Sequence, residues 1–396
     1  MAMRVGICGT GAFADCFIPL FKAHPEVREV VLCDLDAAKV RAKAERFAIA
    51  RTCPSLDELC QADVDAIAIF SQNWKHGPQA VQALRAGKHV YSAVPSAISL
   101  DEIRDLVRTV EATGRLYMIG ETSYYYPAAI YCRERFRQGD FGPIVYAEGE
   151  YYHDFDHGLY DVMKWRGGAD WKRYAGSPPM YYPTHSTSMI VGVTGAHMTH
   201  VSCLGWVDRH EDGLFGPDAN VWHNEFSNET ALFRLSDGSA ARINEFRRIG
   251  HVGGERLNLY GTKASFEEQY GNRVWVDKHR EGCVDLTELL SCAGVPAVAA
   301  DGMGALPAAD AVHRGVSKVH PVQLLPREFV GLGNGHCGSH QFLVHDFVMA
   351  CVSGVTPPNH VWAAARYLVP GLIAHESALQ DGALLAVPDL GEPPRR

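Results

Sequence analysis

Short apolar runs alternate with amphipathic stretches along the first third of the chain. Apolar runs bounded by turn residues predict buried strands at 5–8, 30–33, 66–70, 89–91 and 116–119. Between them, apolar residues recur every three or four positions, which predicts helices at 13–23, 37–47, 78–86 and 100–113. Such alternation is typical of a parallel sheet covered by helices on both faces. The sequence therefore predicts an α/β domain with a doubly wound parallel sheet over residues 1–123.

The pattern changes after residue 123. Pro127 opens a predicted helix, and a strand follows at 144–152. Longer strands at 229–235, 240–247, 256–260 and 265–269 indicate a large, mostly antiparallel sheet. Residues 293–326 predict a long loop or insertion, and helices at 341–352 and 362–380 close the chain. We expect residues 124–396 to form an α+β domain, with packing of the late helices against the first domain as an alternative.

Composition narrows the range of partners. The 396 residues are 47% hydrophobic, enough for the cores of two or three domains. The net charge is −9 without a long basic run, so nucleic acid and anionic membranes are not expected partners. Neither a signal-peptide pattern nor a membrane-spanning apolar run occurs, so we expect a soluble cytoplasmic protein. The 11 cysteines show no CxxC spacing, which favours reduced thiols over disulfides or a cysteine metal site.

The first predicted strand is followed by a glycine-rich turn, Gly9-Thr10-Gly11-Ala12-Phe13-Ala14. Two glycines let the backbone approach a pyrophosphate, and the amides that open the next helix favour negative charge. Asp34 ends the second strand, where it can accept hydrogen bonds from a ribose diol and would repel a 2′-phosphate. An ordinary glycine-rich turn is the alternative. The context favours a Rossmann domain that binds NAD rather than NADP through Gly9, Thr10, Gly11, Ala12, Phe13 and Asp34.

Together with further motifs, this turn resembles the Gfo/Idh/MocA oxidoreductases, named for glucose-fructose oxidoreductase and inositol dehydrogenase. The motifs are Ser71-Gln72-Asn73-Trp74-Lys75-His76, Ala86-Gly87-Lys88-His89-Val90 and Gly139-Asp140-Phe141-Gly142. The resemblance implies that Ser71, Asn73, His76, Ala93 and Val94 contribute to the NAD site. Ordinary dehydrogenases of this family carry Glu-Lys-Pro after the strand that ends in His-Val, and the lysine takes part in proton transfer. Here those positions are Ala93-Val94-Pro95, so a plain dehydrogenase would lack its usual base.

A closer resemblance is to the NAD-dependent glycosidase branch, typified by α-N-acetylgalactosaminidases. That branch has valine before the same proline and a Tyr-Pro-Thr-His stretch, here Tyr182-Pro183-Thr184-His185. It also has a glutamate after the last Rossmann strand, matching Glu121, and a tyrosine just before a His-Asp pair, matching Tyr151. The resemblance implies catalytic roles for these two residues and for Tyr182 and His185. The chain departs from the branch at Ala93, where an acid is usual, and at Ser186-Thr187-Ser188, which replaces a glycine-rich continuation.

The reaction of that branch is redox-neutral and needs NAD to stay bound. The C3 hydroxyl is oxidised, the acidified C2 hydrogen is removed, and the C1 group leaves by elimination. Water then adds, and the hydride returns to C3. The pair of carboxylates used by most glycosidases is not required.

The residue chemistry supports proton transfer independently of the resemblance. Histidine titrates near neutral pH, so His185 can accept the proton of a sugar hydroxyl, although a structural histidine is the alternative. Tyr182 lies three residues earlier and can pair with it on one helical turn. Tyr151 and Tyr152 point to opposite faces of a strand, so the register decides which one meets substrate. Tyr151 and Tyr182 are both candidates for the C2 base.

Aromatic and cationic residues mark candidate substrate contacts. Trp165, Arg166 and Lys172 combine aromatic faces with positive charge, which suits sugar stacking or an anionic substituent. A charged loop balanced by nearby aspartates is the alternative. His336 and His340 precede a late helix and are assigned to the same cleft.

The run His153-Asp154-Phe155-Asp156-His157 resembles a metal-binding sequence, but alternate residues of a strand face opposite ways. We therefore predict that it forms a solvated loop or lines the substrate site, and that the protein uses no metal.

Three functions remain open from the sequence. The first is an NAD-dependent glycoside hydrolase that acts on a small-molecule glycoside, with an anionic substituent as an option. The second is an NAD-dependent sugar or cyclitol dehydrogenase, and the third is a non-catalytic, NAD-binding sugar sensor. The large sheet of the second domain offers a face for homo-oligomerisation.

Overall fold

The structure is a computed structural model that describes residues 2–251, 253–269, 271–279, 283–292 and 313–394. The chain divides into two compact units. The first unit comprises Met1–Tyr126, Cys292–Ala365 and Leu390–Arg396, and the second comprises Pro127–Ser291 and Arg366–Asp389. The segment 313–365 therefore lies with the N-terminal residues.

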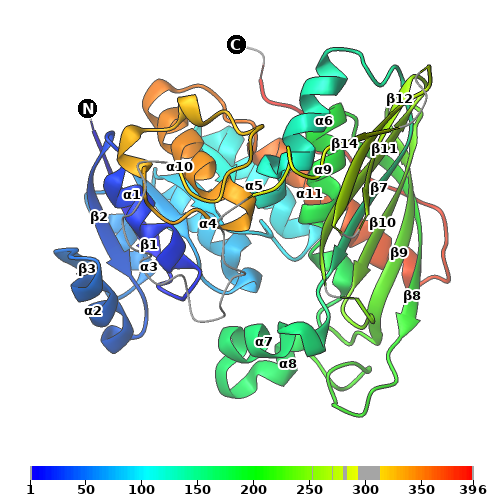
Figure 1. Ribbon diagram of the computed structural model, residues 1–396. Helices are drawn as coiled ribbons and strands as arrows, with labels where there is room; N and C mark the ends of the chain where they lie inside the picture. Colours follow the sequence, from blue (N-terminus) through cyan, green and yellow to red (C-terminus); the bar gives the residue numbers. More distant parts are fainter. Residues whose placement is uncertain (1, 252, 270, 280–282, 293–312, 395–396) are drawn as a thin grey trace. The chain divides into compact units, whose positions relative to one another are not determined.

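The first unit contains a six-stranded sheet in the order β3-β2-β1-β4-β5-β6 (Figure 1). All of its strand pairs are parallel, which confirms the predicted doubly wound sheet. The order reverses between β1 and β4, and ligands of such folds bind at the carboxyl ends of the strands beside this point. The strands are β1 (Met3–Cys8), β2 (Val27–Cys33), β3 (Arg51–Cys53), β4 (Ala66–Ile69), β5 (His89–Ser92) and β6 (Tyr117–Ile119).

Helices of the first unit largely follow the predicted order. They are α1 (Ile18–Ala23), α2 (Ala37–Arg46), α3 (Leu56–Gln61), α4 (His76–Arg85), α5 (Leu100–Thr113) and α10 (Gly335–Ser353). The predicted helix at 13–23 is instead a 3-10 turn, η1 (Ala14–Cys16), followed by α1. Pro19 has no amide N–H and is tolerated in the first turn of a helix, which fits the start of α1 at Ile18.

The core of the first unit joins segments from both ends of the chain. Phe17 and Phe21 beside the sheet form one buried cluster with Tyr91, and Phe342 and Phe347 of α10 belong to the same cluster. Of the predicted loop at 293–326, residues 293–312 lie outside the described residues. Residues 313–326 are irregular apart from the short turn η7 (Val322–Leu324).

The second unit contains a nine-stranded sheet in the order β14-β13-β12-β11-β7-β10-β9-β8-β15 (Figure 1). Every pair is antiparallel except β7 with β10, so the predicted large, mostly antiparallel sheet is confirmed. The strands are β7 (Ile144–Tyr152), β8 (Met198–Val207), β9 (Phe226–Leu235), β10 (Ala240–Phe246), β11 (Gly254–Gly261), β12 (Ala264–Gln269), β13 (Asn272–Asp277), β14 (Cys283–Asp285) and β15 (Leu385–Ala386).

The helices of this unit are α6 (Pro127–Arg137), α7 (Leu159–Gly167), α8 (Trp171–Ala175), α9 (Thr184–Thr194) and the part of α11 (Val361–Ala378) from residue 366 onward. No helix was predicted between the strands at 144–152 and 229–235. Helix α9 escaped prediction because nearly all of its side chains are buried, which leaves no polar stripe. It lies against β7, β10 and β11.

A glycine brings α9 close to the sheet. A Cβ added at Gly149 of β7 would lie 2.5 Å from the carbonyl oxygen of Ser186, so no other residue fits there without a shift. Tyr151, two residues further along β7, shares this face. Tyr152 points to the opposite face, where its ring stacks on Phe246 with the centroids 5.1 Å apart. The register therefore places Tyr151, not Tyr152, beside α9.

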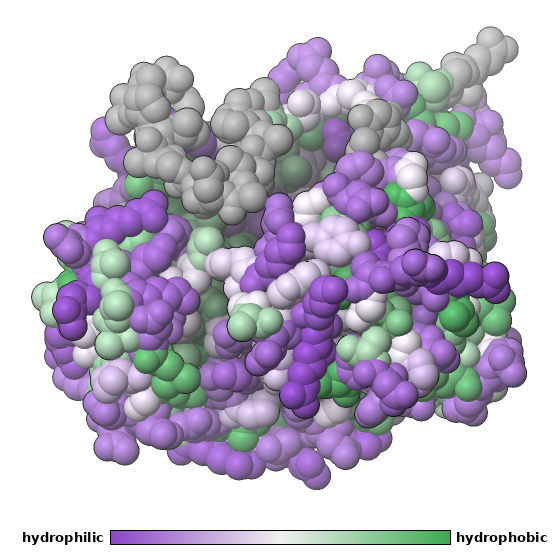
Figure 2. All heavy atoms as spheres, turned by 90° about the horizontal axis from the view of Figure 1, so that it is seen from below, coloured by the Kyte–Doolittle hydropathy of each residue, from purple (hydrophilic) through white to green (hydrophobic). Residues whose placement is uncertain are grey.

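Hydrophilic side chains predominate on the face shown in Figure 2, and hydrophobic residues are scattered among them. Within the described residues, no helix combines the length and the apolar character needed to cross a membrane.

Candidate active site

The glycine turn of the first unit follows β1, and Gly9 exposes backbone there without a side chain. Gly9 has a φ of +88°, and a Cβ at this position would lie 2.7 Å from the carbonyl carbon of Phe70 and the amide of Ser71. Its own amide donates to the carbonyl oxygen of Cys33 at 2.8 Å. Only glycine allows this turn to pass between the ends of β2 and β4, which is where a dinucleotide's pyrophosphate approaches such a sheet.

Asp34 is held as an ionised acceptor at the end of β2. The amide and the hydroxyl of Thr10 donate to Oδ2 at 2.8 and 2.9 Å, and Nζ of Lys39 lies 3.2 Å from it. Burial acts to raise the pKa of Asp34, but the hydrogen bonds from Thr10 and Asp36 outweigh it and hold the pKa below its ordinary value. A charged acceptor suits the ribose diol of NAD, so these residues fit the cofactor.

The other predicted cofactor residues lie on two loops that His76 links. His76 is buried, and its ring nitrogens lie 2.9 Å from the carbonyl oxygen of Pro95 and 3.0 Å from that of Ser71. Ala93 and Val94 are buried on the second loop. Asn73 begins the 3-10 turn η2 (Asn73–Lys75) that leads into α4. His76 thus fixes the positions of both loops.

Glu121 also belongs to the first unit. Its carboxylate is fully buried at the start of η3 (Thr122–Tyr125) and accepts from the amide of Ser123 at 2.9 Å. Burial and then the Glu121 charge raise the pKa of Tyr91. Of the four predicted catalytic residues, Glu121 is the one that is not in the second unit.

The other three predicted catalytic residues form a cluster in the second unit. The ring centroid of Tyr151 lies 5.2 Å from that of His185 and 6.2 Å from that of Tyr182, and the last two are 5.4 Å apart. Tyr182 precedes α9 instead of lying on its first turn as expected, because the helix begins at Thr184. Strand β7 and the start of α9 thus bring together residues that are far apart in sequence.

His153 forms a hydrogen bond with Tyr151 of this cluster. The sequence predicted that His153 lies in a solvated loop or lines the substrate site. Nδ1 of His153 lies 2.8 Å from the hydroxyl of Tyr151. Burial, followed by the charges of Arg247 and Arg166, lowers the pKa of His153 to about 3. His153 is therefore neutral near neutral pH, and one hydrogen bond joins its Nδ1 to the phenol. Burial raises the pKa of Tyr151 well above its ordinary value.

An ion pair that was not predicted lies beneath the cluster. Glu245 of β10 is fully buried, accepts from the hydroxyl of Ser186, and accepts from Arg247 at 2.9 Å. Burial raises the pKa of Glu245 to about 7, although Arg247, Ser186 and His185 act in the opposite direction. The Arg247 guanidinium also lies over the Tyr151 ring, 4.9 Å from its centroid. Arg247 therefore contacts both the buried carboxyl and the phenol.

A second buried carboxylate supports the segment before α9. Glu229 of β9 lies opposite Glu245 in the sheet, accepts from the amide of Met180 at 2.8 Å, and pairs with Nδ1 of His375 at 2.7 Å. On the same strand face, Glu229 is followed by Ala231 and Phe233, and Glu245 is preceded by Ala241 and Ile243. A charged residue in an apolar register is the sequence signal that would have identified them.

The predicted substrate residues of α7 and α8 differ in their surroundings. The Arg166 guanidinium lies 5.9 Å from the ring centroid of Tyr182, whereas Lys172 donates to the carbonyl oxygen of Asp212 at 3.0 Å. Trp165 is 49% exposed. Arg166 is thus the member of this group that reaches the cluster.

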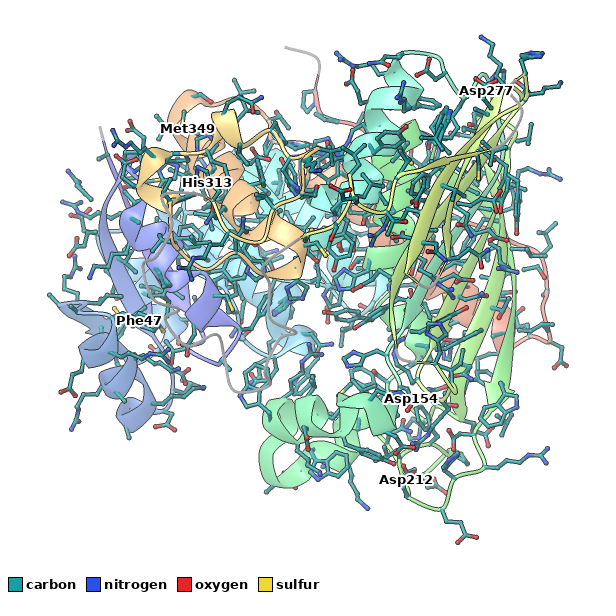
Figure 3. All side chains as sticks on the ribbon, viewed as in Figure 1. Phe47, Asp154, Asp212, Asp277, His313 and Met349 are labelled. Carbon is teal, nitrogen blue, oxygen red and sulfur yellow. The ribbon has the colours of Figure 1, made fainter. Side chains whose placement is uncertain are left out.

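Arg248 fixes the segment that carries α7. It donates to Asp208 at 3.2 Å and to the hydroxyl of Tyr160 at 3.0 Å, and it pairs with Asp212. Figure 3 labels Asp212 and Asp154, which lie near α7 and α8. Asp154 accepts from the amide of Ile249 at 2.7 Å. Arg247 therefore contacts the cluster, and the next residue, Arg248, holds the segment of α7.

His336 and His340, predicted as substrate residues, lie in the first unit against Phe13 of the glycine turn. The centroid of Phe13 is 5.7 Å from that of each imidazole. Among the described residues, no group of His, Cys, Asp and Glu side chains is arranged to hold a metal ion.

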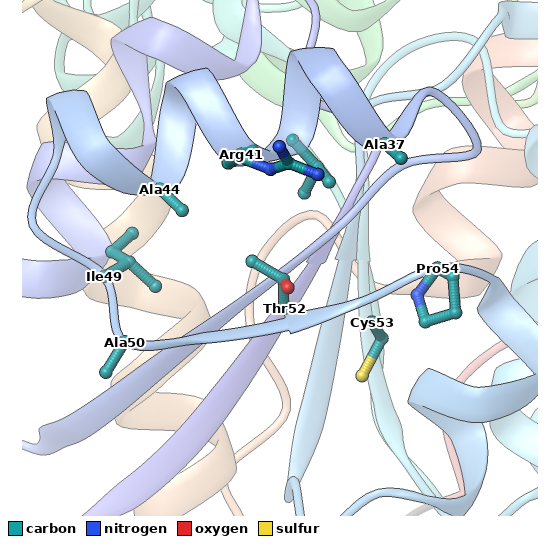
Figure 4. A pocket seen from close by; sticks show the side chains of 9 residues that line it. Ala37, Arg41, Ala44, Ile49, Ala50, Thr52, Cys53 and Pro54 are labelled. Atoms are coloured by element: carbon teal, nitrogen blue, oxygen red, sulfur yellow. The ribbon is translucent and has the colours of Figure 1, made fainter.

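A hollow of about 360 Å³ lies between α2 and β3 (Figure 4). It contains none of the residues discussed above, and a single charged side chain, Arg41, lines it. Its lining residues are Ala37, Val40, Arg41, Ala44, Ile49, Ala50, Thr52, Cys53 and Pro54. Because no Asp, Glu, His or Tyr is among these lining residues, the hollow is not a site for the proton transfer assigned to the cluster.

Known proteins match this chain in sequence, and one match falls within the first unit. Residues 3–121 match the profile GFO_IDH_MocA, described as "Oxidoreductase family, NAD-binding Rossmann fold". A "Glycosyl hydrolase family 109 protein" of Streptomyces niveus is 26% identical over 98% of this chain and 77% of its own length. A "Glycosyl hydrolase family 109 protein 1" of Bacteroides fragilis is 35% identical, over 41% of this chain and 38% of its own length.

Solved structures share the fold. A levoglucosan dehydrogenase in complex with NADH superposes with a TM-score of 0.75 at 17% identity, covering 98% of this chain and all of the other. Myo-inositol 2-dehydrogenase from Lactobacillus plantarum gives a TM-score of 0.70 at 18% identity with the same coverage. The profile match and the geometry of the glycine turn and Asp34 lead to one conclusion. Residues 3–121 form an NAD-binding Rossmann domain that matches the Gfo/Idh/MocA oxidoreductase family.

Proposed function

We propose that the protein is an NAD-dependent glycoside hydrolase that cleaves its substrate by transient oxidation at C3. The observation that carries the proposal is the Tyr151, Tyr182 and His185 cluster, in which the hydroxyl of Tyr151 lies 2.8 Å from Nδ1 of His153. The nicotinamide, when bound, accepts a hydride from the sugar and returns it. The remaining chemistry is proton transfer by side chains of the chain.

His185 is proposed to take the proton of the C3 hydroxyl. The loop that carries a lysine in ordinary dehydrogenases is Ala93-Val94-Pro95 here and has no titratable group. His185 is nearly buried at the start of α9 and lies within the electrostatic influence of Glu245. A nearby carboxylate favours the imidazolium that forms when His185 accepts a proton.

Tyr151 is proposed as the C2 base. A phenol is a weak base until it loses its proton, and burial makes that loss harder for Tyr151. Arg247 lies over the ring, where its charge stabilises a phenolate, and Nδ1 of His153 lies 2.8 Å from the hydroxyl and orients it. Tyr182 has Arg166 at 5.9 Å. These contacts favour Tyr151 as the base and leave Tyr182 and Arg166 to position the sugar, including an anionic substituent if it carries one.

The relatives named glycosyl hydrolase family 109 support this function. A sugar or cyclitol dehydrogenase is the second candidate, because the solved structures that share the fold over nearly the whole chain carry such titles. The absence of the loop lysine counts against it.

One experiment separates the candidates. The protein, supplied with NAD, is incubated with nitrophenyl glycosides and with free sugars, and both aglycone release and NADH formation are recorded. Release without net NADH supports the hydrolase, and NADH without release supports the dehydrogenase. A binding-competent protein that does neither on any sugar is a sensor, and that result rejects the proposal. Tyr151→Phe serves as the matched variant, expected to bind NAD normally and to release no aglycone.

We also propose that the chain forms a homo-oligomer through the face of the large sheet opposite α9. Leu204 and Trp206 of β8 and Leu232 of β9 share this face and are 65%, 48% and 57% exposed. Adjacent exposed apolar residues are typical of an interface. A molar mass that stays that of one chain at high concentration, by light scattering, would reject this proposal.

A further inference from the structure

The start of α10 contains a short turn with an unusual, non-helical backbone conformation. His336, Cys337 and Gly338 are three successive residues with left-handed φ angles of 47°, 49° and 84°. Residues other than glycine rarely adopt this conformation, and they keep it only where their surroundings fix it. Strain of this kind is concentrated at ligand-binding positions.

Close packing on several sides fixes the turn. A Cβ at Gly335 would lie 2.6 Å from Cε1 of His340, and one at Gly338 would lie 2.7 Å from the carbonyl oxygen of Gly315. The side chain of Asn334 accepts from the amide of Gln341 at 3.1 Å. His340 is fully buried against Phe17, with ring centroids 4.4 Å apart. The turn is therefore packed in one position.

Hydrogen bonds determine where the protons of the two histidines lie. The amide of Gly335 donates to Nδ1 of His340 at 3.3 Å, so this nitrogen carries no proton. Burial lowers the pKa of His340 well below its ordinary value, so the ring is neutral and its proton is on Nε2. Nε2 lies 2.9 Å from Nδ1 of His336 and donates to it. His336 therefore carries its own proton on Nε2, which makes that nitrogen a donor.

This donor is in the same unit as the glycine turn. Phe13, the fifth residue of the turn, contacts the imidazoles of both His336 and His340 edge to face. His340 is buried, whereas His336 is partly exposed. A fixed N–H donor beside the glycine turn has the chemistry of a phosphate ligand.

We propose that His336 binds a phosphate group of the dinucleotide through Nε2–H, with His340 as the positioning residue that fixes its tautomer. The cofactor site thus includes a turn far downstream of the glycine motif. The role differs from the substrate contact that the sequence predicted for both histidines. It rests on NAD binding and holds whether the reaction is hydrolysis or dehydrogenation.

The test compares ligands with and without the pyrophosphate. His336→Phe keeps a ring against Phe13 and removes the donor. By calorimetry on the full chain, we expect NAD and ADP-ribose to bind about tenfold more weakly to this variant, as for loss of one hydrogen bond to a charged group. Adenosine binding should be unchanged.

His345→Phe is the matched control. It lies on the same helix and loses a similar bond, because Nδ1 of His345 is 3.1 Å from Nε2 of His24. We expect it to bind all three ligands as the wild type does.

Two results would overturn the proposal. One is a folded His336→Phe variant that binds ADP-ribose with wild-type affinity, and the other is an equal loss of affinity for adenosine. If circular dichroism shows that His336→Phe does not fold, His336→Asn replaces it. Asparagine tolerates the left-handed conformation, and its amide is too short to replace Nε2, so the same tenfold loss is expected.

Discussion

Replacing Glu245 by glutamine should change how the stability of the second unit depends on pH. Burial raises the pKa of Glu245 from 4.5 to about 7. A carboxyl whose pKa is higher in the folded chain than in the unfolded chain destabilises the fold as pH rises from about 4.5 to about 7. At ~1.4 kcal/mol per pH unit, the loss amounts to roughly 3 kcal/mol. Glutamine keeps the shape and does not titrate, so Glu245→Gln should lack this loss.

Urea unfolding of the full chain, followed by tryptophan fluorescence, measures the effect at about pH 5 and about pH 8. Part of the loss has already occurred at about pH 5, so relative to the wild type Glu245→Gln should gain roughly 2.5 kcal/mol between the two conditions. Glu229→Gln is the control, because it removes an equally buried carboxylate from the adjacent strand and leaves Glu245 in place. This variant measures the effect of losing a buried carboxylate while Glu245 is intact. A stability difference between wild type and Glu245→Gln that is the same at both pH values would refute the reasoning.

Three further predictions concern the cofactor and the reaction. Asp34→Ala should weaken NAD binding by about tenfold, because a ribose diol loses a charged acceptor, and unchanged affinity by calorimetry would contradict that role. His185→Ala should lose at least about a hundredfold in turnover while NAD affinity stays normal, and near-wild-type turnover would return the proton transfer to another group. In deuterated water, the released sugar should carry deuterium at C2, and deuterium placed at C3 should largely stay there. Product whose C2 hydrogen is wholly unexchanged would rule out elimination, provided that solvent reaches the base.

The local parts of the molecule were predictable from the sequence. The strand, glycine turn and acid at Gly9 and Asp34 depend on short-range geometry, so the NAD-binding unit could be predicted from its motif. The apolar runs predicted the type of each sheet, but not the strands β3, β8, β13, β14 and β15.

The rest depended on contacts that no local pattern encodes. Tyr151 and Tyr152 are equivalent in sequence, and only the register of β7 against α9 distinguishes them. Glu245 was missed because its importance comes from burial and from its contacts with Ser186 and Arg247. The contact of His340 with Phe13 joins residues near opposite ends of the chain, which periodicity cannot reveal.

The parallel pairing of β7 with β10 has a consequence for folding. Antiparallel neighbours can form as hairpins, but parallel strands require a crossover connection. Here that connection includes α7, α8, α9, β8 and β9. Tyr151 and Glu245 face each other across this pair, so they meet only after the intervening segment has closed its loop. Pairing distant strands loses loop-closure entropy before the stabilising contacts form. The proton-transfer cluster should therefore be among the last parts of the second unit to form.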